Sequence, residues 1–147
     1  VSNALRAVMF RDPFQRTLSL WRNLEELTHM GVVSRSFKKH NCTDPVNCSF
    51  ADFVRVLARE PRGVGDEHQA SQYAIARPDL MHYHFVGLLG NETDEHTLYR
   101  DILGTAPVHV HASAHVEPDP AHLPKARPTI QHIYAKDYAM LRDFDLM

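Results

Sequence analysis

The chain has 147 residues, of which 44% are hydrophobic and 23% are charged, and its formal net charge is −2 with histidine neutral. Length and composition favour a single globular domain over residues 1–147. The small negative charge argues against a general nucleic-acid surface, and no apolar run reaches the roughly 18 residues that a membrane-spanning helix needs.

The first half of the chain is predicted to hold one strand and two helices. An apolar run over residues 5–10 predicts a short buried strand. Apolar residues three and four positions apart then predict one helix over residues 14–30, which Gly31 ends. The polar residues 34–48 are expected to form a loop, and Ser49 is expected to cap the second helix.

The second half has a similar pattern with a less regular middle. A run rich in aromatic and β-branched residues over 80–89 predicts a second buried strand. Around it we expect a short helix or turn over 66–76, a helix over 92–103, a Pro-rich irregular loop over 105–128 and a final amphipathic helix over 129–144. Alternating strands and helices predict an α/β domain with a parallel sheet.

The turn between the first strand and the first helix carries the main functional signal. Asp12 suits the N-cap and Pro13 suits the first helical position, because the amide that proline lacks would have no partner there. Arg11 can present a planar fork to a phosphate, and Ser19 can add a hydroxyl donor. The turn predicts an anion-binding site; the alternative is that Arg11 and Arg16 are solvated residues and Ser19 is incidental.

The same run, Arg-Asp-Pro-Phe-x-Arg-x-x-Ser from Arg11 to Ser19, resembles the 3′-phosphate-binding motif of carbohydrate sulfotransferases. The resemblance is to the Golgi group that includes the chondroitin and dermatan 4-O-sulfotransferases. These enzymes transfer a sulfuryl group from 3′-phosphoadenosine 5′-phosphosulfate (PAPS) to a carbohydrate hydroxyl. The resemblance implies that Arg11 and Ser19 hold the 3′-phosphate of this nucleotide.

Four later segments are similar to motifs of that family and keep their order. Together they cover most of the chain and imply a P-loop-like sulfotransferase fold, with a short parallel sheet flanked by helices. The chain departs from the family pattern at His84, where the family usually has aspartate, at Leu88, where it often has lysine, and at Gln69, where it usually has an aromatic residue. The segments are Ser49-Phe50-Ala51-Asp52-Phe53-Val54, Asp66-Glu67-His68 with Gln72, His82-Tyr83-His84-Phe85-Val86-Gly87, and Ile133-Tyr134-Ala135-Lys136-Asp137-Tyr138.

The family binds the 5′-phosphosulfate in a loop that carries a lysine and lies upstream of Arg-Asp-Pro. These 147 residues do not contain such a loop. We therefore expect an N-terminally truncated domain with part of the PAPS site. A non-catalytic remnant that binds nucleotide at most is the alternative function.

His68 is the candidate catalytic residue, as a base or on the substrate side, because Asp66 beside it could orient its ring. The alternative is that Asp66 caps a helix and His68 is a surface or packing residue. Arg16, Lys125 and Arg127 are further candidates for binding nucleotide phosphate, although exposed basic residues are usually only solvated. No metal is expected; a His-rich metal-binding module built on His109, His111 and His115 is a third hypothesis.

Compartment signals come from sequons and cysteines. Asn41, Asn47 and Asn91 each begin an N-glycosylation sequon. Cys42 and Cys48 flank a short loop and are expected to form a local disulfide in an oxidising compartment, the alternative being two free thiols. We expect a Golgi-lumenal domain of a type II membrane protein, anchored by a segment outside these residues. Its expected partner is an oligosaccharide or glycosaminoglycan acceptor, and no nucleic acid.

Overall fold

The computed structural model describes residues 4–31, 35–60, 69–106 and 116–147. Within these ranges β1 (Ala7–Phe10) and β2 (Phe85–Leu88) form a parallel two-stranded sheet. Ala7 pairs with Phe85 and Phe10 pairs with Leu88, so two segments far apart in the sequence lie side by side. The expected α/β class, a short parallel sheet flanked by helices, is confirmed.

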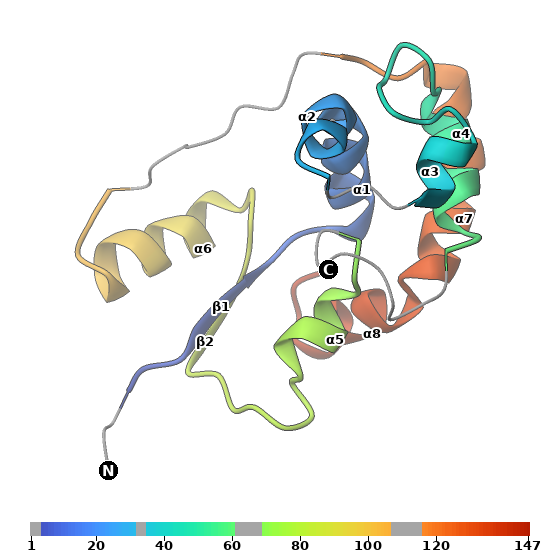
Figure 1. Ribbon diagram of the computed structural model, residues 1–147. Helices are drawn as coiled ribbons and strands as arrows, with labels where there is room; N and C mark the ends of the chain where they lie inside the picture. The colour runs from blue at the N-terminus through green and yellow to red at the C-terminus, as the bar shows by residue number, and fades with distance from the viewer. Residues whose placement is uncertain (1–3, 32–34, 61–68, 107–115) are drawn as a thin grey trace.

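Helices surround the sheet in Figure 1, with α5 and α8 to one side of the strands and α6 to the other. The helices α1, α4 and α7 pack together as a separate layer beyond the end of β1. None of the described helices has the length and apolar character needed to span a bilayer. In chain order these elements are α1 (Pro13–Arg22), α2 (Leu24–His29), α3 (Arg35–Lys39), α4 (Phe50–Leu57), α5 (Gln72–Ala76), α6 (Glu92–His96), the π-helical η1 (Thr97–Ile102), the 3₁₀ turn η2 (Pro120–His122), α7 (Leu123–Ile133) and α8 (Ala135–Asp143).

Two hydrophobic clusters follow from this packing. The larger cluster joins α1, α4 and α7 through side chains such as Trp21, Phe53 and Ile130. The smaller one lies between the strands and α5 and α8, and its buried members are Phe10, Ala76, Met140 and Leu141. Since α1 belongs to the larger cluster and β1 to the smaller one, the turn between β1 and α1 lies at the junction of both.

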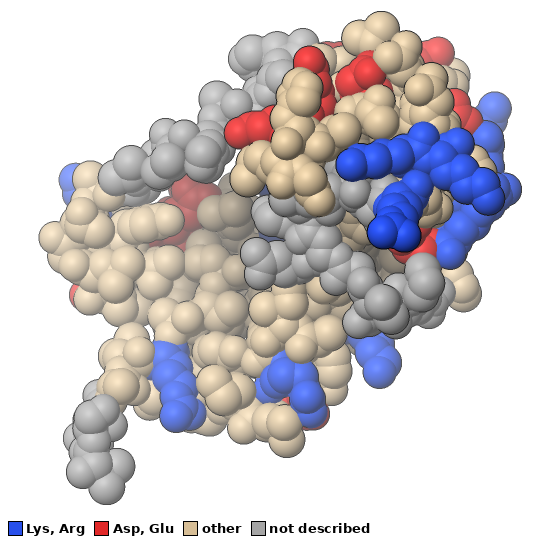
Figure 2. All heavy atoms as spheres, in the orientation of Figure 1, with Lys and Arg blue, Asp and Glu red and all other residues tan. Residues whose placement is uncertain are grey.

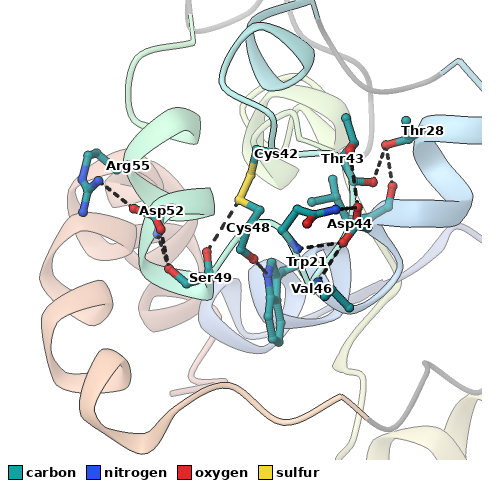
Figure 3. The surroundings of a disulfide bond; sticks show 12 residues. Trp21, Thr28, Cys42, Thr43, Asp44, Val46, Cys48, Ser49, Asp52 and Arg55 are labelled. Atoms are coloured by element: carbon teal, nitrogen blue, oxygen red, sulfur yellow. Dashed lines mark hydrogen bonds and ion pairs between the residues drawn. A yellow bond between two sulfur atoms is a disulfide. The ribbon is translucent and has the colours of Figure 1, made fainter.

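A disulfide between Cys42 and Cys48 closes the loop between α3 and α4, as Figure 3 shows. Both cysteines are buried at 1% exposure, and the indole nitrogen of Trp21 donates a hydrogen bond to the carbonyl of Cys48 at 2.7 Å. Inside the loop, Asp44 accepts hydrogen bonds from the amides of Val46 and Asn47. The loop is therefore fixed to α1 as well as closed on itself.

Several predicted boundaries in the first half differ from the structure. The single helix expected over 14–30 is divided into α1 and α2 at Asn23, whose side-chain amide donates to the carbonyl of Ser19 at 3.0 Å. The loop expected over 34–48 contains α3, which buries Phe37. Ser49 caps α4 as predicted, because its side chain accepts a hydrogen bond from the amide of Asp52.

The second half shows larger departures. Of the strand expected over 80–89, only Phe85–Leu88 forms β2. The helix expected over 92–103 consists of α6 followed directly by η1. The prediction of a loop over 105–128 is wrong for residues 123–128, because α7 begins at Leu123 and includes Pro128. The final helix is interrupted at Tyr134, which separates α7 from α8.

Candidate anion-binding site

The candidate site lies where β1 passes into α1. β1 ends at Phe10, and α1 begins at Pro13. Asp12 is the N-cap of α1, and its side chain accepts a hydrogen bond from the amide of Gln15 at 2.8 Å. Phe14 follows and is buried in the larger cluster. Because the cap and the buried ring fix the first turn of α1, Arg11 is held between the strand and the helix.

The charges around Arg11 are mostly of the same sign. Its guanidinium is half-buried and has no hydrogen-bond or ion-pair partner among the residues that the structure describes. Burial lowers the pKa of Arg11 from its ordinary value, the charges of Arg22 and Arg16 lower this pKa as well, and only Asp12 opposes them. Arg22 is itself paired with Glu117 at 2.8 Å. A cation that is partly removed from water and lies near other cations favours the binding of an anion.

The backbone of Arg11 is held by one side chain from far along the sequence. The amide of Arg11 donates to Oε1 of Gln72 at 2.8 Å, and Nε2 of Gln72 donates to the carbonyl of Arg11 at 2.7 Å. The carbonyl of Phe10 still accepts from Leu89, so the pairing between the strands ends one residue earlier. Gln72 therefore takes the place of a neighbouring strand at Arg11.

Asp137 of α8 holds Gln72 in turn. This carboxylate is fully buried and accepts three hydrogen bonds from the start of α5: from the amide of Gln72 at 2.9 Å, from the amide of Tyr73 at 3.0 Å, and from the hydroxyl of Ser71. Amides in the first turn of a helix lack partners within the helix, and a carboxylate satisfies them well. The start of α5 is thus fixed to α8.

The two residues before Ser71 are held by other elements. Nη1 of Arg16 in α1 donates to the carbonyl of Ala70 at 2.6 Å, and the hydroxyl of Tyr134 donates to the carbonyl of Gln69 at 2.9 Å. Burial raises the pKa of Tyr134 to about 12, so this phenol stays a hydrogen-bond donor well into alkaline pH. Residues 69–73 therefore connect α1, α8 and the end of β1.

The structure places the other predicted nucleotide-binding residues at different distances from this turn. Ser19 lies in the second half of α1, and its carbonyl accepts from Asn23. Arg127 of α7 reaches the start of α1, where its guanidinium stacks on the Phe14 ring at 4.2 Å from the centroid. Lys125 is exposed in the first turn of α7. The candidate base His68 lies outside the described residues.

All three predicted glycosylation sites are exposed. Asn91 caps α6 through its side-chain oxygen, which accepts from two amides, so its nitrogen is left without a hydrogen bond in the described part of the chain. The side-chain nitrogen of Asn47 donates to Asp44 at 2.7 Å, and Asn41 has a positive φ of 54°. Of the two capping or turn asparagines, Asn91 keeps its side-chain nitrogen free among the described residues, whereas that of Asn47 is bonded to Asp44.

A cavity of about 600 Å³ lies beside residues 69–71, on α4, α5 and α8. Its polar lining includes Tyr73, Arg77, Tyr134 and Lys136. Neither Arg11 nor Ser19 lines it, so the cavity is separate from the anion-binding turn.

The roles of Gln72 and Asp137 were not predicted, although both residues belong to motifs named above. One signal was available for Asp137: it lies three residues after Tyr134 and four before Leu141, on the apolar stripe of the final helix. A carboxylate at such a position needs buried donors. Nothing in the local sequence of Gln72 indicates its contact with Arg11.

Among the described residues no group of three histidine, cysteine, aspartate or glutamate side chains could hold a metal ion. His109, His111 and His115, on which the metal-binding hypothesis rests, lie outside those residues, so it stays a hypothesis. In comparison with known proteins, the model of the sulfotransferase family matches residues 1–142 of this chain. No curated protein and no solved structure matches it.

Proposed function

Because the chain belongs to the sulfotransferase family, we propose that it serves sulfuryl transfer from PAPS to a carbohydrate hydroxyl and that Arg11 and Ser19 hold the 3′-phosphate. Family membership indicates a transferase of sulfuryl groups. The observation that carries the finer proposal is the Arg11 guanidinium, which is half-buried, lies near two other arginines and has no ion-pair partner in the described part of the chain.

The chemistry of side chains at the turn and farther along α1 supports the proposed recognition of the 3′-phosphate. Arg11 offers a planar pair of N–H donors, which matches two oxygens of a phosphate, and Ser19 offers a neutral hydroxyl. Arg127, stacked on Phe14, adds a cation at the start of α1. When PAPS is bound it supplies the sulfuryl group, and the part of this turn is to recognise and orient the nucleotide.

The proposed acceptor is an anionic carbohydrate chain such as a glycosaminoglycan. Figure 2 shows Lys and Arg side chains gathered over the region of α3 and α4, although the net charge of the chain is −2. The exposed basic residues there are Arg35, Lys38, Lys39, Arg55 and Arg59, of which Arg55 is paired with Asp52. Such a surface attracts a polyanion in a salt-dependent way.

The proposal includes a catalytic base. A sulfuryl acceptor hydroxyl needs a base within hydrogen-bond reach, and His68 is the candidate from the sequence. The alternative function is a domain that binds nucleotide without transferring sulfate. Sulfate transfer from labelled PAPS to chondroitin, measured with His68→Ala as the control, separates these two functions, because the remnant binds the nucleotide without any turnover.

A lumenal location in the Golgi, in a type II membrane protein, is part of the proposal. The buried disulfide between Cys42 and Cys48 and the three exposed sequons support an oxidising, glycosylating compartment. Expression of the chain with a signal peptide in mammalian cells tests this. We expect a mobility shift on glycosidase treatment that Asn91→Gln reduces, and an unshifted chain would contradict it.

Calorimetry with two nucleotides tests the nucleotide site. Adenosine 3′,5′-bisphosphate carries the 3′-phosphate, and adenosine 5′-phosphate does not. Arg11→Ala should weaken binding of the bisphosphate by about 1.5–3 kcal/mol, the value of a charged hydrogen bond, and leave the monophosphate unchanged. The exposed Arg142→Ala in α8 is the matched control. If Arg11→Ala leaves the ratio of the two affinities unchanged, Arg11 does not bind the 3′-phosphate.

A further inference from the structure

Arg11 lies one residue beyond the last strand pairing of β1. Its peptide amide and carbonyl would have no backbone partner in the described part of the chain. Both groups are instead bonded by the carboxamide of Gln72, at 2.8 Å and 2.7 Å. Because the two bonds lie on either side of the same Cα atom, they fix the direction in which the Arg11 side chain leaves the backbone.

The position of Gln72 is fixed through its backbone amide. Its amide donates to the buried carboxylate of Asp137, and α5 begins at this residue. The carboxamide therefore extends from a fixed helix end toward a fixed strand end. Glutamine suits this position because its side chain offers a donor and an acceptor together. Glutamate lacks the donor, and methionine has a similar length but lacks both.

We propose that Gln72 is a positioning residue for the 3′-phosphate of the nucleotide, acting through the backbone of Arg11 without touching the ligand. This inference rests on the proposed function of Arg11. A guanidinium held in one direction loses less freedom when it binds a phosphate, so the affinity for the phosphate depends on the carboxamide. The effect is confined to ligands that carry a 3′-phosphate.

Gln72→Met tests the loss of both hydrogen bonds. We expect the dissociation constant for adenosine 3′,5′-bisphosphate to rise about tenfold, because the loss of both bonds lets the Arg11 side chain leave its binding direction, with adenosine 5′-phosphate unaffected. The exposed Gln131→Met in α7 is the matched control. Circular dichroism at the assay temperature verifies that each variant is folded.

Gln72→Glu adds a readout that a merely structural role would not move. As a carboxylate it removes the donor to the Arg11 carbonyl and introduces a negative charge beside the site. As a protonated acid it again offers one O–H donor and one carbonyl acceptor. The ratio of its bisphosphate affinity to that of the wild type should therefore recover as the pH falls from 7 toward about 4.3, the ordinary pKa of glutamate. The ratio for Gln72→Met should stay constant over the same range.

The outcomes separate this inference from the proposed function. If both Gln72 variants bind the bisphosphate like the wild type while Arg11→Ala does not, Gln72 has no positioning role and the nucleotide site stands. If Arg11→Ala also binds like the wild type, the nucleotide site itself is wrong. If Gln72→Met fails to fold, the pH titration of Gln72→Glu decides, and a flat affinity ratio overturns the inference.

Discussion

Replacing Asp137 by asparagine should destabilise the chain far more than a conservative change usually does. The aspartate is fully buried, and its two oxygens accept from Ser71, Gln72 and Tyr73. In Asp137→Asn one oxygen becomes an NH₂ group. The less costly orientation places this group opposite the Gln72 amide, so that two donors face each other and one bond is lost.

The size of the effect follows from this bond count. A buried donor left unsatisfied costs about 1–3 kcal/mol. The two remaining bonds lose the assistance of a charge, which roughly halves their strength. Together we expect a loss of about 2–4 kcal/mol in the free energy of unfolding, out of the roughly 5–15 kcal/mol that a domain has. Asp137→Ala leaves all three donors unmatched and should cost more.

Urea unfolding followed by the fluorescence of Trp21 measures this loss. The chain has a single tryptophan, and it is 2% exposed in the native state. With a slope of about 2 kcal/mol per molar urea, the midpoint should fall by about 1–2 M. Asp143→Asn, at the exposed end of the same helix, is the control. Equal midpoints for the two variants would refute the assignment of Asp137 as the anchor of α5.

Three further predictions concern other parts of the chain. Replacing Cys42 and Cys48 by serine opens a loop with a sequence separation of 6, and the free energy of unfolding should fall by about 2 kcal/mol by the chain-entropy relation. A reducing agent should lower the urea midpoint of the wild type and leave that of the double variant unchanged. Gly87→Ala places a Cβ atom 2.7 Å from the Met9 sulfur and 3.0 Å from both the Asp94 Cβ and a Phe85 ring carbon. Because these three contacts cannot all move away, the variant should lose about 1–3 kcal/mol of stability in thermal unfolding, and an unchanged melting temperature would contradict this. Burial raises the pKa of Tyr134 from 10.0 to about 12, so the unfolded chain loses this proton first and stability should fall as the pH rises from 10 to 12. Tyr134 should contribute about 3 kcal/mol to this fall for two pKa units. Burial also raises the pKa of Tyr138 to about 12, so Tyr134→Phe should reduce the fall without abolishing it, which urea midpoints across this pH range would show.

The local parts of the fold were predictable because their signals lie within a few residues. Asp12 and Ser49 each cap the helix that follows, and the turn after β1 has its expected form. Periodicity alone gave wrong boundaries where a side chain competes with the helix backbone. Asn23 bonds the carbonyl of Ser19 and ends α1 within a stripe of apolar residues that continues into α2.

Proline was a misleading signal near the end of the chain. Pro-rich sequence predicts a loop, yet α7 includes both Pro124 and Pro128. Pro124 lies in the first turn, where the missing amide has no consequence. Pro128 lies four residues later, so the amide that it lacks would have bonded to the carbonyl of Pro124. Buried Ala126 and Ile130 pack against the larger cluster, and this burial maintains the helix despite the lost bond.

Only part of the candidate site could be predicted from the sequence, because its residues lie far apart along the chain. Arg11 has a local motif, whereas Gln72 lies 61 residues from Arg11 and Asp137 lies 65 residues from Gln72. Each of the three belongs to a different short segment that resembles sulfotransferase motifs, and each segment alone is a weak match. In the folded chain Asp137 holds Gln72, and Gln72 holds Arg11. The segments are therefore parts of one hydrogen-bonded connection that ends at Arg11, so a change at Asp137 should reach Arg11 only through Gln72.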